Sequence, residues 1–296
     1  MITKNCFVSI VGKPNVGKSS LLNKIVGEKI AAISDKPQTT RTKITGVLTK
    51  EGTQYVFMDT PGFHKTKNKL SEHMIKAVNE SLTDNDIIML VVDCTKVLTA
   101  EEKALIDNLK ASRTKTILVI NKIDLIEDKT KLLGIISQYS QYYDFLSIIP
   151  VSVLNDDGID IIMKELDKNA VIGPHFFPED MLTDQPEKVI ASEIIREKIL
   201  NLMSEEVPHG IAVTIDTMRE REDKDILDIS AVIYCEKESH KGMVIGKNGS
   251  MLKQIGSLSR EELESFFEIK INLQCWVKVK EGWRNREGII KNFGLS

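Results

Sequence analysis

The sequence has few cysteines, little net charge and no long hydrophobic run. Its four cysteines, Cys6, Cys94, Cys235 and Cys275, are scattered without a C-x-x-C pair, which argues against a disulfide framework or a cysteine zinc site and favours a reducing compartment. The net charge of −3 means that a polyanionic partner would need a local basic patch. Apolar runs fall far short of the roughly 18 residues that span a bilayer, and the start lacks a signal-peptide pattern. We therefore expect a soluble, cytoplasmic protein.

Short apolar segments alternate with helical stretches over the first 170 residues. Five of them, 7–11, 54–58, 87–92, 116–120 and 147–150, have the length and the β-branched content of strands. They are almost entirely apolar instead of alternating, which indicates that helices cover both faces of the sheet. The pattern predicts a doubly wound α/β domain whose sites lie at the carboxyl ends of the strands.

The length of 296 residues and an apolar content of 42% favour two domains, each with its own core. We assign residues 1–170 to the first domain. Residues 171–186 contain Gly173, Pro174, Pro178 and Pro186 without sustained periodicity, so this segment is expected to be a linker. Residues 187–296 predict a helix (187–206), strands (211–218 and 226–236), a glycine loop, a helix (250–267), a strand (270–280) and a C-terminal helix. This is a smaller α+β domain.

A glycine-rich loop follows the first strand directly and leads into a helical run. It consists of Gly12, Lys13, Pro14, Asn15, Val16, Gly17, Lys18 and Ser19, with Ser20 next, and matches the phosphate-loop pattern G-x-x-x-x-G-K-[ST]. In such loops backbone amides surround the phosphates, the lysine reaches the β and γ oxygens, and the hydroxyl binds Mg²⁺. The alternative of a chance glycine loop is disfavoured by the position between strand and helix.

A second motif, Asp59, Thr60, Pro61 and Gly62, ends the strand 54–58. The Asp59 carboxylate is placed to hold Mg²⁺ through a water molecule, and the Gly62 amide is placed to meet the γ-phosphate. Between the two motifs, the polar segment 38–42 contains Thr40, a candidate metal ligand whose contact would depend on the γ-phosphate. An ordinary threonine-rich loop or strand is the alternative for that segment. The expected metal ligands are Ser19, Thr40 and Asp59, and the expected catalytic groups are Lys18, Thr40 and Gly62.

The segment after the strand 116–120 selects the base. Asn121, Lys122 and Asp124 form an N-K-x-D motif, in which the Asp carboxylate accepts hydrogen bonds from guanine N1–H and N2–H₂. Adenine has no donor at C2, so an Asp left unpaired there would reject it. The motifs together predict binding of GTP and GDP and hydrolysis of GTP.

A second glycine loop, Gly246, Lys247, Asn248 and Gly249, lies between two helical stretches of the C-terminal domain. Glycines let a nucleic-acid backbone approach, and the nearby residues Lys241, Ile245 and Lys253 complete the candidate RNA site. Residues 270–291 hold six basic residues against two acidic ones, which is a local basic patch, with a solvated charged face as the alternative. In the last strand, Trp276 points away from the core. Packing under the terminal helix, around residues 283–293, is the favoured interpretation, and stacking on a base is the alternative.

The four motifs in this order resemble the Era subfamily of the translation-factor-related GTPases over essentially the whole chain, with a type II KH domain at the C-terminus. The resemblance implies binding of the 3′ end of small-subunit ribosomal RNA, action in small ribosomal subunit assembly and a monomer. It also implies a guanine O6 contact through a backbone amide at Ser152 and Val153, where Val replaces the usual Ala. Asn15 becomes a candidate K⁺ ligand, with a purely structural loop residue as the alternative. Phe63 stands where Ras-like enzymes carry a water-positioning Gln, so slow intrinsic hydrolysis is expected.

Other functions are compatible with part of these motifs. A GTPase switch could act on another RNA or peripherally at the inner face of the cell membrane. A P-loop kinase would share the phosphate loop but would not need N-K-x-D. An RNA-binding scaffold with a structural nucleotide would not need the complete set of Lys18, Ser19 and Asp59.

Overall fold

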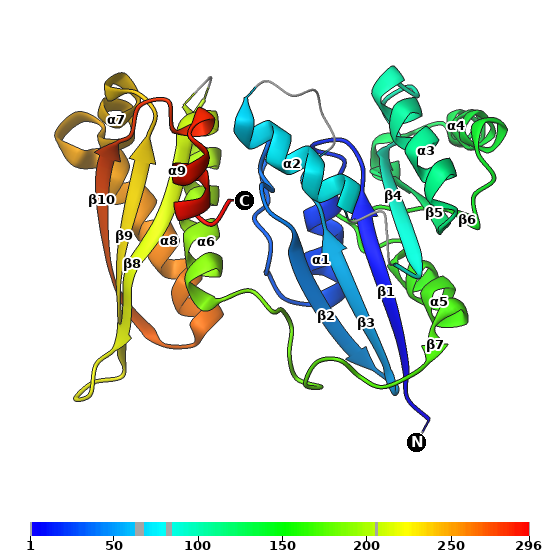
Figure 1. Cartoon of the computed structure of the whole chain (residues 1–296), viewed down its shortest axis with the longest axis horizontal. Coiled ribbons are helices and arrows are strands. Elements are labelled where there is room, and N and C mark those ends of the chain that lie inside the picture. Colours follow the sequence, from blue (N-terminus) through cyan, green and yellow to red (C-terminus); the bar gives the residue numbers. More distant parts are fainter. Residues whose placement is uncertain (1, 63–67, 81–84, 205–206, 296) are drawn as a thin grey trace. The chain divides into compact units, whose positions relative to one another are not determined.

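The computed structural model describes residues 2–62, 68–80, 85–204 and 207–295 (Figure 1). The chain divides into two compact units. The first comprises Met1–Ala31, Thr40–Lys65 and Met74–Asp184, and the second comprises Ala32–Thr39, Thr66–His73 and Gln185–Ser296. Each unit has its own sheet. Among the described residues, no helix is both long and apolar enough to cross a membrane.

The described residues of the first unit form a seven-stranded sheet with the order β2-β3-β1-β4-β5-β6, to which β7 adds beside β1. The parallel strands are β1 (Lys4–Val11), β3 (Thr53–Asp59), β4 (Ile87–Asp93), β5 (Lys115–Asn121) and β6 (Ser147–Pro150). These are the five predicted strands, so the doubly wound sheet is confirmed. β2 (Ile44–Lys50) pairs antiparallel with β3 and was not predicted.

Helices cover both faces of this sheet. They are α1 (Lys18–Val26), α2 (Lys69–Glu80), α3 (Ala100–Ser112), α4 (Lys129–Tyr142) and α5 (Ile159–Asn169). On β4, Ile88, Leu90 and Val92 share a core with Leu105 of α3 and Tyr139 of α4. The intervening β4 residues point the opposite way and are also buried. A strand buried on both faces has no polar side to show, which explains its all-apolar sequence.

The expected linker, 171–186, is attached to the first unit over most of its length. It begins with β7 (Val171–Ile172), which pairs antiparallel with β1. The Gln54 side chain accepts hydrogen bonds from the Phe176 and Phe177 amides at 2.7 and 3.0 Å, and the Val47 amide donates to the Leu182 carbonyl at 2.8 Å. Proline and glycine there interrupt regular structure without freeing the chain, because side chains and edge groups of the sheet satisfy its backbone.

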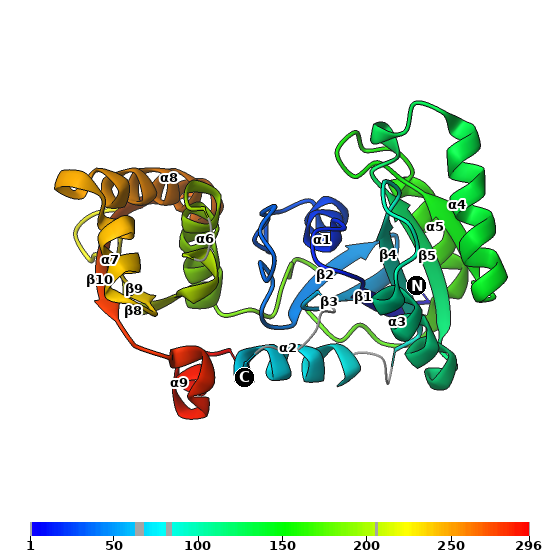
Figure 2. The same ribbon diagram turned by 90° about the horizontal axis from the view of Figure 1, so that it is seen from above.

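The second unit has the order α6 (Glu187–Leu202), β8 (Ile211–Glu220), β9 (Ile226–Cys235), α7 (Glu238–Ile245), α8 (Ser250–Phe267), β10 (Lys270–Val279) and α9 (Glu287–Asn292). β9 pairs antiparallel with β8 and parallel with β10. Helices α6, α7 and α8 lie on one face of this sheet (Figure 2). The predicted order of elements is confirmed, although α6 ends at Leu202 instead of residue 206, where Met203 is extended.

The C-terminal segment packs on the opposite face of the second sheet. Phe293 contacts Tyr234 and Trp283, with ring centroids 4.6 and 5.4 Å apart. Trp283 is completely buried and its Nε1–H donates to the Gly210 carbonyl at 3.0 Å. Trp276 remains 58% exposed. The interpretation that favoured Trp276 as the residue packed under the terminal helix is therefore wrong, because Trp283 occupies that place.

Gly46 of β2 packs closely against α1 and the segment that follows it. A Cβ there would lie 2.6 Å from Leu22 Cδ1 and 2.9 Å from Ile30 Cδ1. We expect Gly46→Ala to lower the free energy of unfolding by about 1–3 kcal/mol through overpacking. Gly134→Ala is the matched control, since Gly134 lies exposed in α4 with nothing within 4 Å of the added Cβ. The control should be neutral or stabilising by about 0.4–1 kcal/mol. Urea unfolding followed by circular dichroism compares the two variants, and equal midpoints would contradict the packing argument.

Candidate nucleotide site and nucleic-acid groove

The predicted phosphate loop connects β1 to the start of α1 at Lys18. Gly17 has a φ of +100°, and a Cβ there would lie 2.2 Å from Asn121 Nδ2, so glycine alone fits this position. The Lys18 Nζ donates to the Gly12 and Lys13 carbonyls at 3.2 and 2.9 Å and is held inside the loop. Burial lowers the pKa of Lys18 to about 8, and the charge of Asp59 opposes that shift. An anionic phosphate at the loop would favour the charged ammonium.

Three oxygen-bearing side chains from separate segments converge beside this loop. The Ser19 hydroxyl donates to Asp59 Oδ2 at 2.6 Å and lies 2.8 Å from the Thr40 hydroxyl. Asp59 is fully buried, and its Oδ1 has no hydrogen-bond partner among the described residues. Burial raises the pKa of Asp59 to about 6, against the opposing effects of Lys18 and the two hydroxyls. A buried carboxylate oxygen without a partner, beside two hydroxyls, fits a hard cation such as Mg²⁺.

The end of the Asp59 motif lies directly against the phosphate loop. The Thr60 hydroxyl donates to the Ile10 carbonyl at 2.9 Å, which fixes the chain beside β1. A Cβ on Gly62 would lie 2.7 Å from the Pro14 ring and backbone, so a side chain at that position would push the two segments apart. Pro61 and Gly62 are buried. Phe63, the residue expected to slow hydrolysis, lies outside the described residues.

Asn121 and Lys122 connect the base motif to the phosphate loop. The Asn121 Nδ2 donates to the Val16 carbonyl at 2.9 Å. The Lys122 Nζ donates to the Asn15 carbonyl and to Asp93 Oδ2, both at 2.8 Å. Two of the three motif residues therefore position the phosphate loop through its carbonyl groups.

Asp124 is the motif residue that remains available to a base. It is exposed, and one carboxylate oxygen accepts a hydrogen bond from the Ser152 hydroxyl at 2.5 Å. The Val153 amide donates to Asn121 Oδ1 at 3.1 Å, so this amide is engaged within the protein. Ser152 and Val153 thus lie beside the base motif as expected, and Ser152 orients the Asp124 carboxylate.

Asp93 is a site residue that the sequence analysis missed. It ends β4, is 5% exposed and pairs with Lys122. Burial alone would raise its pKa, but hydrogen bonds from Lys122 and Thr95 hold the pKa below the usual value. Asp93 could have been identified from the sequence, because it is an acidic residue at the carboxyl end of an all-apolar strand. In the sheet, that strand lies next to the strand before the phosphate loop.

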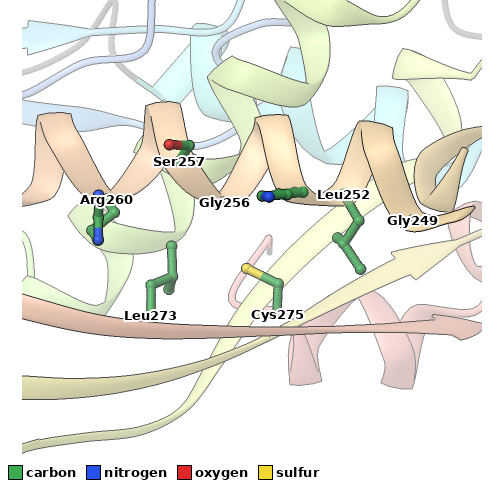
Figure 3. A pocket seen from close by; sticks show the side chains of 8 residues that line it. Gly249, Leu252, Gly256, Ser257, Arg260, Leu273 and Cys275 are labelled. Carbon is green, nitrogen blue, oxygen red and sulfur yellow. The ribbon is translucent and has the colours of Figure 1, made fainter.

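A groove of about 540 Å³ lies in the second unit between α8 and β10 (Figure 3). It is lined by Gly249, Leu252, Lys253, Gly256, Ser257, Arg260, Leu273 and Cys275. Figure 3 shows Leu273 and Cys275 pointing from β10 toward the helix. Burial raises the pKa of Cys275 to about 11, so its thiol is neutral at physiological pH. The groove combines an apolar floor with basic residues, as a site for unstacked bases and phosphates requires.

Two of the residues predicted for the RNA site, Gly249 and Lys253, line this groove directly. Gly246, Lys247 and Asn248 form the loop at its end, where Lys247 and Asn248 are exposed. Lys241 belongs to α7 and pairs with Glu238 at 3.4 Å, and Ile245 is the last residue of that helix. The missed lining residues Leu252, Gly256 and Arg260 recur every four residues. That helical spacing could have identified them.

Comparison with known proteins gives the same two-part organisation. Residues 7–122 match the family described as "50S ribosome-binding GTPase", and residues 206–284 match the KH domain family. The chain is 51% identical over 293 residues to GTPase Era of Clostridioides difficile, covering 99% of both chains. It is also 51% identical over 294 residues to GTPase Era of Ruminiclostridium cellulolyticum, covering 99% of this chain and 98% of the relative.

Two solved structures resemble the whole chain. Era in complex with MgGDPNP and nucleotides 1506–1542 of 16S ribosomal RNA is 37% identical, has a TM-score of 0.96 and is matched over 99% of both chains. A variant of Aquifex aeolicus Era bound to GDP·AlF₄⁻ is also 37% identical with a TM-score of 0.96, over 99% of this chain and 100% of that chain. Identity near one half over the full length is decisive: the chain belongs to the Era family and is a GTPase, with a P-loop GTPase domain followed by a KH domain.

Proposed function

We propose that this GTPase is a switch that binds small-subunit ribosomal RNA through its KH groove and acts in assembly of the small ribosomal subunit. The groove between α8 and β10 is the main support for RNA binding, because apolar residues lie there beside Lys253 and Arg260. The relative whose solved structure contains nucleotides 1506–1542 of 16S ribosomal RNA supports this choice of RNA. In the proposed complex, the exposed loop residues Lys247 and Asn248 face phosphates, and bases enter the groove.

We further propose the roles of the nucleotide-site residues. Ser19 and Thr40 would hold Mg²⁺, with Asp59 contributing through water, since these oxygens converge and Asp59 Oδ1 has no hydrogen-bond partner among the described residues. Mg²⁺ when bound neutralises charge on the β and γ oxygens. Lys18 reaches the same oxygens from inside the loop, and the Gly62 amide faces the γ-phosphate. The phosphates are surrounded by residues 12–20 and 59–62, and the guanine is read by Asp124.

Slow intrinsic hydrolysis follows from this set of groups. They supply positioning and charge, which are the main requirements of phosphoryl transfer. Among the site residues that the structure describes, none is placed as a base or amide to orient the attacking water. The monomeric state, the cytoplasmic location and a peripheral membrane contact stay predictions.

The connection between the base motif and the phosphate loop predicts an effect of Asn121→Asp. This nearly isosteric change removes the donor to the Val16 carbonyl and places a buried negative charge beside it. We expect GTP and GDP affinities to fall together by roughly 10- to 100-fold, as for an unsatisfied buried polar pair. Asn108→Asp makes the same chemical change on the exposed face of α3 and should leave both affinities unchanged. Titrations with fluorescent GDP and with a fluorescent non-hydrolysable GTP analogue measure both affinities, and a loss confined to the GTP analogue would contradict the role of Asn121 in positioning the phosphate loop.

The proposed RNA binding predicts that RNA stimulates GTP hydrolysis and that this stimulation depends on the glycine loop 246–249. We expect the RNA of nucleotides 1506–1542 to raise the hydrolysis rate of the wild type, and Lys247→Asp to weaken RNA binding by roughly tenfold through charge reversal. Lys224→Asp reverses the same charge in an exposed turn of the second unit and should behave like the wild type. Phosphate release with and without RNA measures the stimulation, and titration with fluorescently labelled RNA measures the affinity. Tight GTP binding with no RNA binding would leave the GTPase standing and remove the RNA assignment.

We also propose that Asn15 binds K⁺ during hydrolysis. Asn15 lies in the phosphate loop with a φ of +64°, a conformation that Gly also adopts readily. Asn15→Gly therefore removes the side-chain oxygen without straining the backbone. Hydrolysis by the wild type should be several-fold faster in KCl than in NaCl at equal ionic strength, and this difference should vanish in Asn15→Gly. Equal wild-type rates in the two salts would rule out the K⁺ site.

A further inference from the structure

Strand β10 presents two different surfaces, because successive side chains point to opposite faces of a sheet. Leu273 and Cys275 point into the groove beside α8 (Figure 3). Trp276 and Lys278 point to the other face. The strand order is β10-β9-β8, so β10 is the edge of this sheet among the described residues. A ligand that leaves the groove over this edge passes from Cys275, which faces the groove, to the outer face, where the next residue, Trp276, lies.

Trp276 is the prominent feature of the outer face. It is 58% exposed, whereas the other tryptophan, Trp283, is completely buried. Its neighbours along the same side of β10 are Asn272 and Gln274, both polar and exposed. Protein docking sites usually carry a contiguous apolar patch, which these polar neighbours interrupt. The register partner of Trp276 on β9, Val232, is buried, and Phe293 of the C-terminal segment covers Tyr234 further along this face. The exposed indole therefore stands at the border of that packed region, where it is suited to stacking on a single planar group.

The charge on this face favours an anionic ligand. Lys278 and Lys280 are exposed beyond Trp276, and their side chains form no hydrogen bond or ion pair with the described residues. Asp228 of β9, an acidic residue that lies opposite Asn272 on the same face, accepts hydrogen bonds from Arg221 and from Asn272, all at 2.7 Å. Its charge is therefore largely compensated. An aromatic ring beside lysines that have no partner among the described residues is a combination that binds single-stranded nucleic acid.

We propose that Trp276, Lys278 and Lys280 form a second contact site for single-stranded RNA, on the sheet face opposite the KH groove. The proposal rests on the proposed function, because it needs RNA in the groove. A KH groove clamps about four nucleotides, so a longer strand must continue onto neighbouring surfaces. The strand leaves the groove, crosses the open edge of β10, stacks an unpaired base on Trp276 and places its phosphates near the two lysines.

The test compares Trp276→Leu with Trp276→Phe in the full chain. Leu keeps an apolar side chain without a ring, and Phe keeps a ring that can stack. The probes are the RNA of nucleotides 1506–1542 and a tetranucleotide that fills only the groove. Trp276→Leu should weaken binding of the long RNA by about 5- to 150-fold, the usual range for one stacked base. Trp276→Phe should recover most of this affinity, and tetranucleotide affinity should not change in either variant.

Two further measurements separate stacking and charge from a general loss of structure. Trp283 is buried, so quenching of the exposed tryptophan by the long RNA should disappear in Trp276→Phe. The double variant Lys278→Gln and Lys280→Gln should make the slope of log affinity against log salt shallower by about 1.4, since each phosphate contact to a single strand contributes about 0.7. Thermal unfolding by circular dichroism confirms that the variants are folded.

The outcomes also distinguish this inference from the proposed function. If Lys247→Asp loses RNA binding while Trp276→Leu binds the long RNA like the wild type, the KH groove stands and the second site is overturned. If Trp276→Leu loses affinity for the small ribosomal subunit but not for RNA, the face contacts protein and the inference is wrong. If the wild type binds neither RNA, the proposed function fails and this inference fails with it.

Discussion

The Asn121 side chain is the contact on which the nucleotide site depends most. Parallel strands bring their loops to one edge of a sheet, but they do not fix the distances between those loops. Asn121 does so, because its amide donates to the phosphate loop and its oxygen accepts from the loop that follows β6. Its side chain is 3% exposed, so a lost partner would leave a buried polar group at a cost of about 1–3 kcal/mol. A residue of the base motif thereby holds the phosphate and base sites in one geometry.

The electrostatics of the site depend on that geometry. Lys18 and Asp59 are both buried, and burial favours the neutral form of each. It lowers the pKa of Lys18 to about 8 and raises the pKa of Asp59 to about 6. The protein thus holds an ammonium and a carboxylate where its own groups only partly compensate their charge. Phosphate oxygens next to Lys18 and a divalent cation next to Asp59 would both favour the charged forms. A magnesium nucleotide bound as proposed would therefore be coupled to the charge states of Lys18 and Asp59, and the low local dielectric would strengthen each contact.

Most of the fold and of the nucleotide site could be predicted from the sequence, and the features that could not be predicted have physical causes. The five parallel strands and α8 were predicted because apolar runs and helical spacing are local patterns. The strand β2 was missed because it contains Thr45, Gly46 and Thr49 and has an antiparallel partner on one side only. Asp93 was missed because its role appears only when β4 lies beside β1 and Lys122 reaches across. Which of Trp276 and Trp283 is covered depends on the path of the last residues, which no local pattern fixes.

The two faces of β10 illustrate how a small domain can enlarge its binding surface without additional elements. A period of two residues gives one strand two independent rows of side chains, and an edge position leaves the way between them open. Usually an edge strand is protected against pairing with other chains by charge. Lys278 of β10 and Lys280 just after it provide that charge, so the residues that discourage edge association are also those proposed to attract phosphate. An exposed tryptophan on this edge is tolerable for the same reason, because the flanking lysines keep its surroundings hydrated and prevent an extended apolar patch.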